Sequence, residues 1–310
     1  MRIGIGIGEI SNDRPGIDGL LAQAEQAERD GFASGWFANI FGVDAIMAAA
    51  LCGRVTTDLE LGTAVVPTYP RHPFAMAQQA LTAQAACEGR FTLGIGLSHQ
   101  MVIEMMFGLS YAKSYSHMRE YLEVLAPLIR NGSVSHSGSE FRVNANLTVP
   151  GATRCPILIA ALAPKMLALA GAVADGTITW MTGPKTLREH TIPRINDAAA
   201  AGRPKPRVVV GLPVAVTTDV AAAREAAARI FQVYGGLPSY RAMLDREGAE
   251  GPSDVAMVGD ESAVGEQIAA LHAIGVTDFL ASPFPVGGDS PESLARTRDA
   301  LVTAGKRCRS

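Results

Sequence analysis

Side chains that could act as acids, bases or nucleophiles are sparse where the short apolar segments of this chain end. Those positions are Glu9, 39–41, 65–69, 97–100, 161–165, 179–181 and Ser282. The chain has no GxSxG elbow, no HExxH motif and no convincing carboxylate pair. Its six histidines, among them His72, His99 and His117, lack metal-ligand spacing. We therefore expect neither hydrolysis nor metal catalysis. A site poor in ionisable groups but rich in glycine suits a cofactor that supplies the chemistry itself.

Two stretches could hold such a cofactor. The first is Gly94-Ile95-Gly96-Leu97-Ser98-His99, followed by Gln100, where glycine permits close approach of the backbone to a ligand. A plain tight turn is the alternative. The second is Ala160-Ala161-Leu162-Ala163-Pro164-Lys165, where small residues lead into a helix that begins at Pro164. Its free N–H groups and positive dipole end would hold a phosphate beside Lys165. An ordinary helix start with a solvated lysine is the alternative.

The elements that must position these stretches alternate between strand and helix from end to end. The pattern predicts strands at 2–8, 34–39, 59–66, 91–96, 156–161, 176–181, 207–217 and 277–282. Helices are predicted between them, for example over 15–30, where Ile17, Leu20, Leu21 and Ala24 form one apolar face. Eight strands, each followed by a helix, favour one α/β domain over 1–310, a (β/α)8 TIM barrel. An open doubly wound sheet is the alternative, but Gly4, Gly6 and Gly8 do not form a GxGxxG motif before a helix.

Two segments interrupt the alternation of strands and helices. Gly, Ser and Asn residues near 131–154 predict an insertion that could form a hairpin. The stretch 235–252, punctuated by glycine and proline, is interpreted as an excursion from this pattern.

Composition excludes several classes of partner. Hydrophobic residues make up 48% of 310 residues, charged residues 18%, and the formal net charge is -3. Without a basic excess or a long apolar run, we expect no nucleic-acid partner and no membrane contact. The first residues lack the features of a signal peptide, and Cys52, Cys87, Cys155 and Cys308 are scattered without CxxC spacing. Reduced thiols in a cytoplasmic protein are therefore expected, with a small-molecule substrate as partner. A homodimer is left open.

Longer motifs resemble a known family. Leu61-Gly62-Thr63-Ala64-Val65, Tyr69-Pro70-Arg71-His72-Pro73 and Gly89-Arg90-Phe91-Thr92-Leu93-Gly94-Ile95-Gly96 look like the central signature of luciferase-like monooxygenases. Ala163-Pro164-Lys165-Met166, continuing to Asp175-Gly176, looks like the second signature. The order and spacing match over nearly the whole chain. Within the family, the chain resembles actinobacterial oxidoreductases that use the deazaflavin coenzyme F420.

The resemblance implies a cofactor lying across the barrel mouth, coenzyme F420 or alternatively FMN. It places a non-prolyl cis peptide at Ala64-Val65, behind the ring. The implied cofactor-binding residues are Asn39, Ile40, Thr63, Ala64, Val65, Gly94, Ile95, Gly96, Leu97, Ser98, His99, Gln100, Ala160, Ala161, Leu162, Ala163, Pro164, Lys165 and Trp180.

The chain departs from the glucose-6-phosphate dehydrogenases that it resembles. Those relatives carry a histidine where this chain has Ile40 and a glutamate where it has Leu97. His99 is then the nearest titratable candidate for a catalytic proton donor, because its ordinary pKa of about 6.5 suits transfer near neutrality. A histidine that only contacts coenzyme or solvent is the alternative, and Tyr69 and Glu9 are weaker candidates.

The leading hypothesis is hydride transfer between F420 and an unidentified organic substrate. One alternative is a monooxygenase that uses reduced FMN and oxygen. The other is a non-catalytic protein that binds F420, which the absent histidine and glutamate keep open.

Overall fold

A closed barrel of eight parallel strands forms the centre of the molecule. The computed structural model describes residues 1–11, 15–199, 201–287 and 290–307. The barrel strands pair in chain order and β12 pairs with β1, which confirms the predicted (β/α)8 barrel. They are β1 (Arg2–Ile7), β2 (Ser34–Phe37), β3 (Glu60–Thr63), β5 (Phe91–Gly96), β8 (Ile157–Ile159), β9 (Gly176–Trp180), β10 (Arg207–Val216) and β12 (Asp278–Pro283). Two shorter strands, β4 (Val66–Pro67) and β11 (Met257–Gly259), extend β5 and β10 on one side each.

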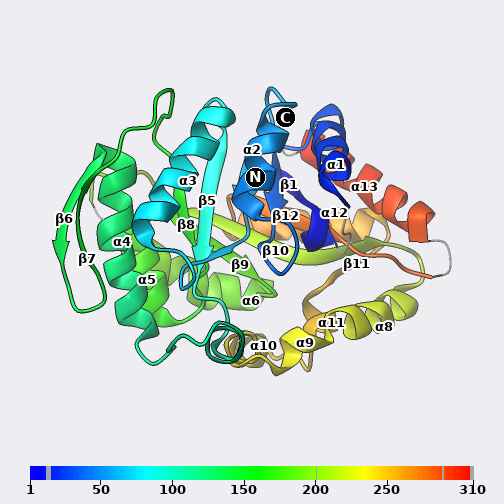
Figure 1. Ribbon diagram of the computed structural model, residues 1–310. Helices are drawn as coiled ribbons and strands as arrows, with labels where there is room; N and C mark the ends of the chain where they lie inside the picture. Colours follow the sequence, from blue (N-terminus) through cyan, green and yellow to red (C-terminus); the bar gives the residue numbers. More distant parts are fainter. Residues whose placement is uncertain (12–14, 200, 288–289, 308–310) are drawn as a thin grey trace.

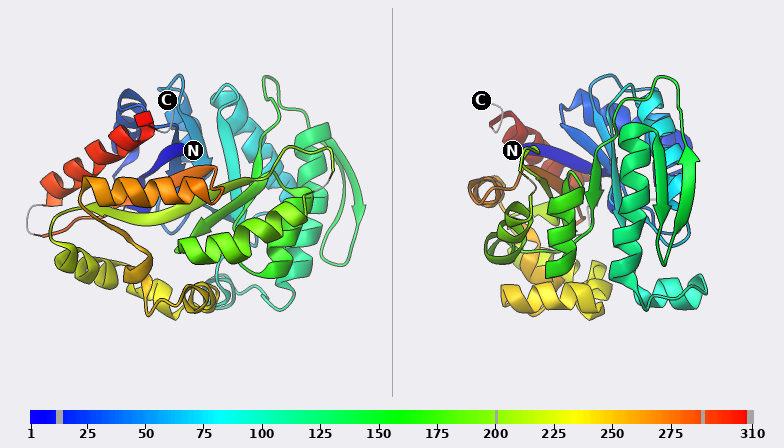
Figure 2. Two further views of the ribbon diagram at one scale, coloured as in Figure 1. Left: turned by 180° about the vertical axis from the view of Figure 1, so that it is seen from behind. Right: turned by 90° about the vertical axis from the view of Figure 1, so that its left-hand side faces the viewer.

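Helices surround the barrel on its outer face (Figures 1 and 2). Alanine-rich stretches supply many of them, because alanine has the highest helix propensity and permits close packing on the strands. Asp44 begins the second helix by accepting hydrogen bonds from the N–H groups of Ile46 and Met47. The helices next to these strands are α1 (Ile17–Arg29), α2 (Ala45–Gly53), α3 (Pro73–Ala86), α4 (Ser114–Asn131), α5 (Pro164–Val173), α12 (Glu261–Ala273) and α13 (Ser290–Arg307).

The stretch 235–252, which glycine and proline mark as an excursion, is mostly helical. After β10 come α8 (Val220–Ile230), α9 (Gln232–Gly236), α10 (Pro238–Glu247) and α11 (Pro252–Val255). Proline occupies the first turn of α10, and Gly248 ends it with a left-handed φ of 84°. Both residues are favourable at helix ends, so here they mark the bounds of helices and not their absence.

The helix predicted after β9 is divided into three pieces. They are α6 (Pro184–Thr186), a π-helical turn η3 (Leu187–Thr191) and α7 (Ile192–Asp197). The π-helical turn keeps the chain helical but changes the direction in which later side chains point.

An antiparallel hairpin occupies the predicted insertion. Its strands are β6 (Ser133–Ser137) and β7 (Arg142–Asn146), and it lies at the edge of the molecule beside α4 (Figure 1). The buried carboxylate of Glu120 on α4 holds the turn by accepting hydrogen bonds from the backbone N–H groups of Glu140 (2.8 Å), Phe141 (3.2 Å) and Ser139 (3.3 Å). These bonds, that of Glu140 foremost, lower the pKa of Glu120 to about 2.

Side chains fill the barrel interior in layers. At the N-terminal end, Arg207 pairs with Glu60 at 2.8 Å and Asp278 at 2.7 Å, and Arg2 pairs with Glu60 at 2.6 Å. The next layer is apolar and consists of Trp36, Leu158, Ile178, Val209 and Leu280. Together the two layers close the N-terminal half of the barrel.

Cys52, Cys87 and Cys155 are buried free thiols, whereas Cys308 lies outside the described residues. Among the residues that the structure describes, no helix is long and apolar enough to cross a membrane.

Candidate functional site

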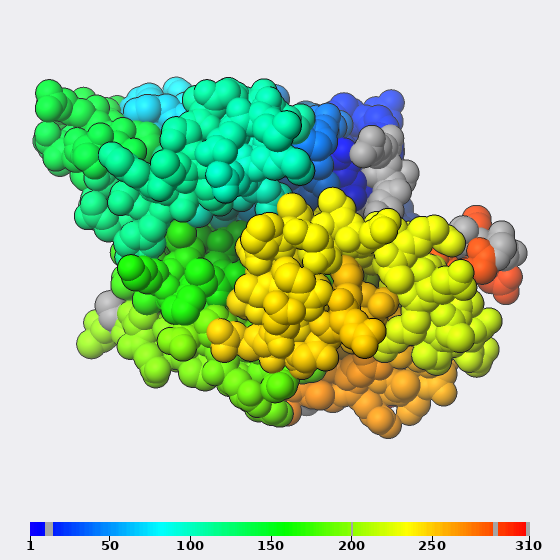
Figure 3. Space-filling view, turned by 90° about the horizontal axis from the view of Figure 1, so that it is seen from below, coloured from blue at the N-terminus to red at the C-terminus, as the bar shows by residue number. Residues whose placement is uncertain are grey.

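The carboxyl ends of the barrel strands meet at one face of the molecule, the mouth of the barrel. The segment 97–113 after β5, which includes the π-helical turn η2 (Val102–Met106), lies on one rim. Helices α9 and α10 lie on the opposite rim (Figure 1). Figure 3 shows this face, with a recess between the first rim, coloured teal, and the second rim, coloured yellow. In barrels of this architecture the active site lies at this end.

Small residues form the inward-facing layer next to this recess. Because successive side chains of a strand alternate, residues two positions beyond the apolar layer also point inward. Ala160 follows Leu158 in this way on β8, and the corresponding residue on β10 is Gly211. Trp180 on β9 is a large residue in this layer, and its ring lies over Gly211, where an added Cβ would be 2.9 Å from Trp180 Cε3. The inward-facing layer at the mouth thus combines small residues with one aromatic ring.

The peptide bond between Ala64 and Val65 is cis, as predicted. It lies between β3 and β4, where the chain bulges. Thr63 Oγ1 fixes the bulge to β5 by donating to Gly94 O at 2.8 Å and accepting from Gly94 N at 2.8 Å. An added Cβ at Gly96 would lie 2.7 Å from Val65 Cγ2. The bulge and the two glycines therefore pack as one unit.

This packing gives Gly94 a role that the sequence interpretation did not assign. A Cβ there would lie 1.9 Å from the Thr63 carbonyl oxygen, so the closest approach to Gly94 is made by the protein's own backbone. Ile95 lies between the two glycines and is fully buried, like Ala161. By strand alternation the Ile95 side chain faces the helices and not the mouth.

Helix α5 begins at the mouth without a side-chain cap. Its N-cap residue Ala163, its first residue Pro164 and the next, Lys165, are all exposed. Helix α6 begins with the same Pro-Lys pair, yet there the Glu247 carboxylate accepts hydrogen bonds from Lys185 N at 3.0 Å and Thr186 N at 2.7 Å. The Glu247 carboxylate thus serves as the anion at the start of α6. No described side chain does so at the start of α5. The first-turn N–H groups of α5 are suited to an anionic ligand.

The loop before α5 is held by a histidine that the sequence analysis missed. His190 Nε2 lies 2.8 Å from the Leu162 carbonyl oxygen, and Arg194 Nε donates to His190 Nδ1 at 3.0 Å. Because Nδ1 accepts, the proton is on Nε2, which donates to Leu162. Burial and the nearby cations Arg246 and Arg194 lower the pKa of His190, so the ring is neutral. No sequence motif links positions 162 and 190.

Asn39 is fixed at the end of β2. Its Oδ1 accepts from Ala45 N at 3.1 Å and from Arg71 at 3.5 Å, and Arg71 also pairs with Asp44. With Oδ1 engaged, the amide nitrogen is the group that Asn39 can offer to a ligand. Its neighbour Ile40 is 44% exposed.

His99 joins the two rims of the mouth. Its ring centroid lies 5.6 Å from that of Tyr240 on α10. The preceding residue Ser98 has a left-handed φ of 59°, and its carbonyl accepts from the Tyr111 hydroxyl at 3.2 Å. Leu97 is half-buried against the core, and Gln100 donates to Glu104 at 2.9 Å. Burial lowers the pKa of His99.

Comparison with known proteins decides the family. The family model for luciferase-like monooxygenases matches residues 3–278. The chain belongs to the luciferase-like monooxygenase family. A putative coenzyme F420-dependent oxidoreductase of Mycobacterium tuberculosis is 31% identical over 180 residues, which are 54% of this chain and 51% of that protein. The 5,10-methylenetetrahydromethanopterin reductase of Methanolobus tindarius is 26% identical over 280 residues, 90% of this chain and 85% of that protein.

Solved structures of other enzymes share the fold. The coenzyme F420-dependent tetrahydromethanopterin reductase of Methanopyrus kandleri superposes with a TM-score of 0.76 at 21% identity, over 98% of this chain and 97% of that chain. The oxygenating constituent of 3,6-diketocamphane monooxygenase of Pseudomonas putida, in complex with FMN, gives a TM-score of 0.74 at 17% identity, over 99% and 97%. The family therefore contains both F420-dependent reductases and FMN-dependent monooxygenases.

The two weaker proton-donor candidates, Tyr69 and Glu9, also lie near the mouth of the barrel. Tyr69 stacks on His117 with ring centroids 4.0 Å apart, and burial raises the pKa of Tyr69 to about 12. Glu9 accepts from Gly42 N at 3.3 Å. Neither geometry singles out a better donor than His99, which contacts Tyr240 on the opposite rim.

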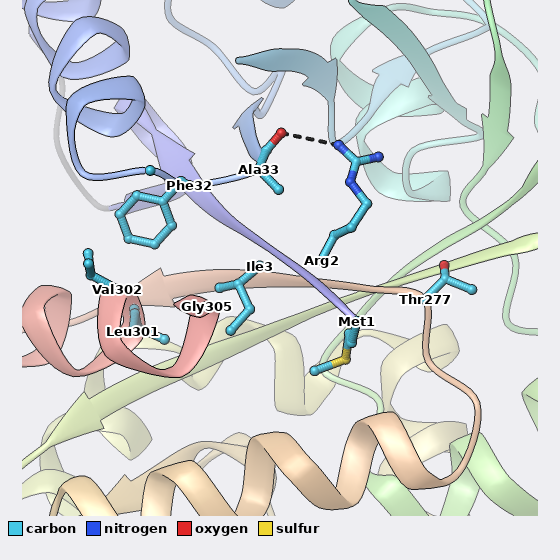
Figure 4. Close-up of a pocket in the computed structure, with 10 residues that line it drawn as sticks. Met1, Arg2, Ile3, Phe32, Ala33, Thr277, Leu301, Val302 and Gly305 are labelled. Carbon is cyan, nitrogen blue, oxygen red and sulfur yellow. Dashed lines mark hydrogen bonds between the residues drawn. The ribbon is translucent and has the colours of Figure 1, made fainter. Parts of the chain in front are cut away.

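A cavity of about 240 Å³ lies away from the mouth, beside the N-terminus of the chain (Figure 4). It is lined mainly by apolar groups of β1 and α13, and by Phe32 after α1. Arg2 donates to the Ala33 carbonyl at 3.1 Å along one side. It contains none of the predicted site residues.

Proposed function

We propose that this protein is an F420-dependent oxidoreductase that transfers a hydride between coenzyme F420 and an organic substrate. The observation that carries the proposal is the combination, at one barrel mouth, of an inward layer of small residues with a helix start that lacks a side-chain cap. A planar ring fits the first and a phosphate fits the second. The relatives named for F420 or methanopterin chemistry support F420, because their likeness extends to the sequence.

The residues present fit such a coenzyme. The bulge at Ala64-Val65, packed on Gly94 and Gly96, offers a rigid wall for one face of a ring. The N–H groups at the start of α5, with Lys165 beside them, would hold the phosphate. His190 keeps the Leu162 carbonyl in place and so fixes the loop that leads into this helix start. Asn39 would offer its amide nitrogen to a carbonyl edge of the ring.

When bound, the coenzyme supplies a two-electron hydride carrier, so the protein needs mainly to orient the reactants and exclude water. The small-residue layer, Trp180 and the two rims shield the mouth. His99 is placed to give a proton to the carbanion or enolate that hydride addition leaves on the substrate. Because burial lowers the pKa of His99, its protonated form increases only as the pH falls below its ordinary value of 6.5.

Binding titrations test the proposal. The purified protein is titrated with F420 and, separately, with FMN, and binding is followed by coenzyme fluorescence. Oxidation of reduced F420 is then measured with a panel of enones, quinones and imines. Selective F420 binding with turnover supports the proposal. Selective FMN binding would favour a flavin monooxygenase, and F420 binding without turnover of any acceptor would favour a carrier protein.

Substitutions at the start of α5 locate the phosphate. Ala163→Asp places a negative charge beside it and should weaken F420 binding about tenfold or more. Lys165→Ala should weaken binding less, about two- to fivefold, because the backbone N–H groups remain. Lys185→Ala is the matched control, since Lys185 occupies the same place in α6, where Glu247 already fills the helix start. Equal dissociation constants for all three variants would place the phosphate elsewhere.

A further inference from the structure

The rings of Trp180, Tyr234, Tyr240 and His99 contact one another in series at the mouth. We term this series the aromatic wall. Trp180 on β9 packs edge to face against Tyr234 on α9, with centroids 5.8 Å apart at 70°. Tyr234 meets Tyr240 on α10 at 5.3 Å and 89°. Tyr240 meets His99 on the opposite rim at 5.6 Å. Three segments that are distant in sequence thus place their rings side by side at the mouth.

Trp180 has an unsatisfied hydrogen-bond donor. Its indole Nε1 is buried and has no partner within normal hydrogen-bond geometry. The Tyr234 hydroxyl is the nearby acceptor, and its interaction with Trp180 partly offsets the effect of burial on the pKa of Tyr234. An indole N–H donates but does not accept, and a buried donor without a partner destabilises the structure that contains it. By contrast, Nε1 of the other tryptophan, Trp36, donates to Ser34 Oγ at 2.9 Å. A carbonyl group in the mouth would therefore give Trp180 Nε1 a well-aligned acceptor, which Tyr234 does not provide.

The rings of the wall are half-buried and carry no charge near neutrality. Burial raises the pKa of Tyr234 and of Tyr240, and it lowers the pKa of His99. A charged ligand placed against these rings would lose its hydration without gaining a counter-charge from them. A flat apolar ligand would instead gain offset or edge-to-face ring contacts.

We propose that the aromatic wall is the substrate-binding face and that it takes a flat, uncharged, conjugated carbonyl compound of the enone or quinone class. The carbonyl oxygen accepts a hydrogen bond from Trp180 Nε1. The inference rests on the proposed function only for the source of the hydride.

The reaction balances with the groups named. A hydride from the reduced coenzyme adds to the carbon at the far end of the conjugated system. The π electrons move to the carbonyl oxygen, where the Trp180 N–H stabilises the developing negative charge. His99 or water then supplies one proton, so the substrate gains two electrons and two hydrogens, and F420 is oxidised.

Trp180 also provides the assay. Menadione, a flat uncharged quinone, is titrated into the protein without coenzyme, and tryptophan fluorescence is recorded. Saturable quenching is expected, because Trp180 borders the mouth whereas Trp36 is fully buried. Tyr240→Leu and Tyr234→Leu should each raise the dissociation constant of menadione about three- to tenfold. The matched control is Tyr115→Leu, since Tyr115 is an exposed tyrosine on α4, and its constant should stay within about twofold. Circular dichroism checks that each variant is folded.

The outcomes separate the two proposals. Wall-dependent menadione binding without F420 binding would sustain this inference and remove the proposed function. F420 binding with no saturable quenching, or with equal menadione constants for Tyr240→Leu, Tyr234→Leu and Tyr115→Leu, would overturn the inference and leave the proposed function standing. Equally tight binding of succinate, a charged and non-aromatic probe, would also overturn it.

Discussion

Gly94→Ala should be among the most damaging single-methyl additions in the barrel. The added Cβ would lie 1.9 Å from the Thr63 carbonyl oxygen and 3.1 Å from the Thr63 carbonyl carbon. Both are backbone atoms, so no side-chain rotation relieves the contact. The strand β5 and the bulge after β3 must separate by about 1.5 Å before the contact becomes ordinary.

The expected cost follows from two contributions. Overpacking in a rigid interior costs about 1–3 kcal/mol. Separation also lengthens the two 2.8 Å hydrogen bonds between Thr63 Oγ1 and Gly94, each worth about 1 kcal/mol. The free energy of unfolding should therefore fall by about 3–5 kcal/mol. At roughly 2 °C per kcal/mol for a chain of this size, the Tm should fall by about 6–10 °C.

Two glycine variants serve as controls in the same thermal melts. At Gly265 in α12 an added Cβ meets nothing within 4 Å, so Gly265→Ala should be neutral or raise stability by about 0.5–1 kcal/mol. Gly96→Ala should be intermediate, because its nearest contact is 2.7 Å from the movable Val65 side chain. If Gly94→Ala melts at the same temperature as Gly265→Ala, the proposed tight packing of the bulge on β5 is refuted.

Three further predictions concern protonation and charge. His99→Gln should abolish the rise in turnover as the pH falls below 6.5 while leaving F420 affinity nearly unchanged; an unaltered pH profile would assign the proton to solvent. Glu120→Gln should lower stability in urea melts at neutral pH. The native carboxylate contributes fully to stability above its unfolded pKa of 4.5 and loses that contribution as the pH falls towards 2. The stability of the variant should therefore fall less steeply in acid than that of the wild type. Parallel curves of stability against pH for the two proteins would contradict this. Arg207→Met leaves Glu60 and buried Asp278 with one fewer cation and should cost about 3–5 kcal/mol; a loss below about 1 kcal/mol would show that Arg2 alone is sufficient.

The barrel could be predicted from sequence because each βα unit carries its own local signal. The strand 91–96 was predicted with its observed bounds, since an apolar run there lies between Arg90 and a polar loop. Helix α10 was not predicted, because Pro238 and Gly248 are residue types that also occur in loops, although here they stand at helix ends. The π-helical turns leave no distinct periodicity in so few residues.

Features of the site could be predicted from the sequence only where a single contiguous segment forms them. The cis bond at Ala64-Val65 followed from a contiguous motif, as did the start of α5 at Pro164. Contacts between distant segments had no such signal. His190 reaches Leu162 from 28 positions away, and Tyr240 meets His99 only because α10 folds over the mouth. Such pairs depend on loop geometry that propensity and spacing do not encode.

The ion-paired layer around Arg207, capped by the Trp36 layer, has a kinetic consequence. A barrel closed at its N-terminal end is open only at the mouth, so both reactants must enter and leave there. If coenzyme F420 binds against the bulge as proposed, its ring would enter before the organic acceptor and depart after its product. Steady-state measurements should accordingly show a compulsory order of addition, in which the reduced product competes with the acceptor for the coenzyme-loaded enzyme and an excess of acceptor delays coenzyme exchange.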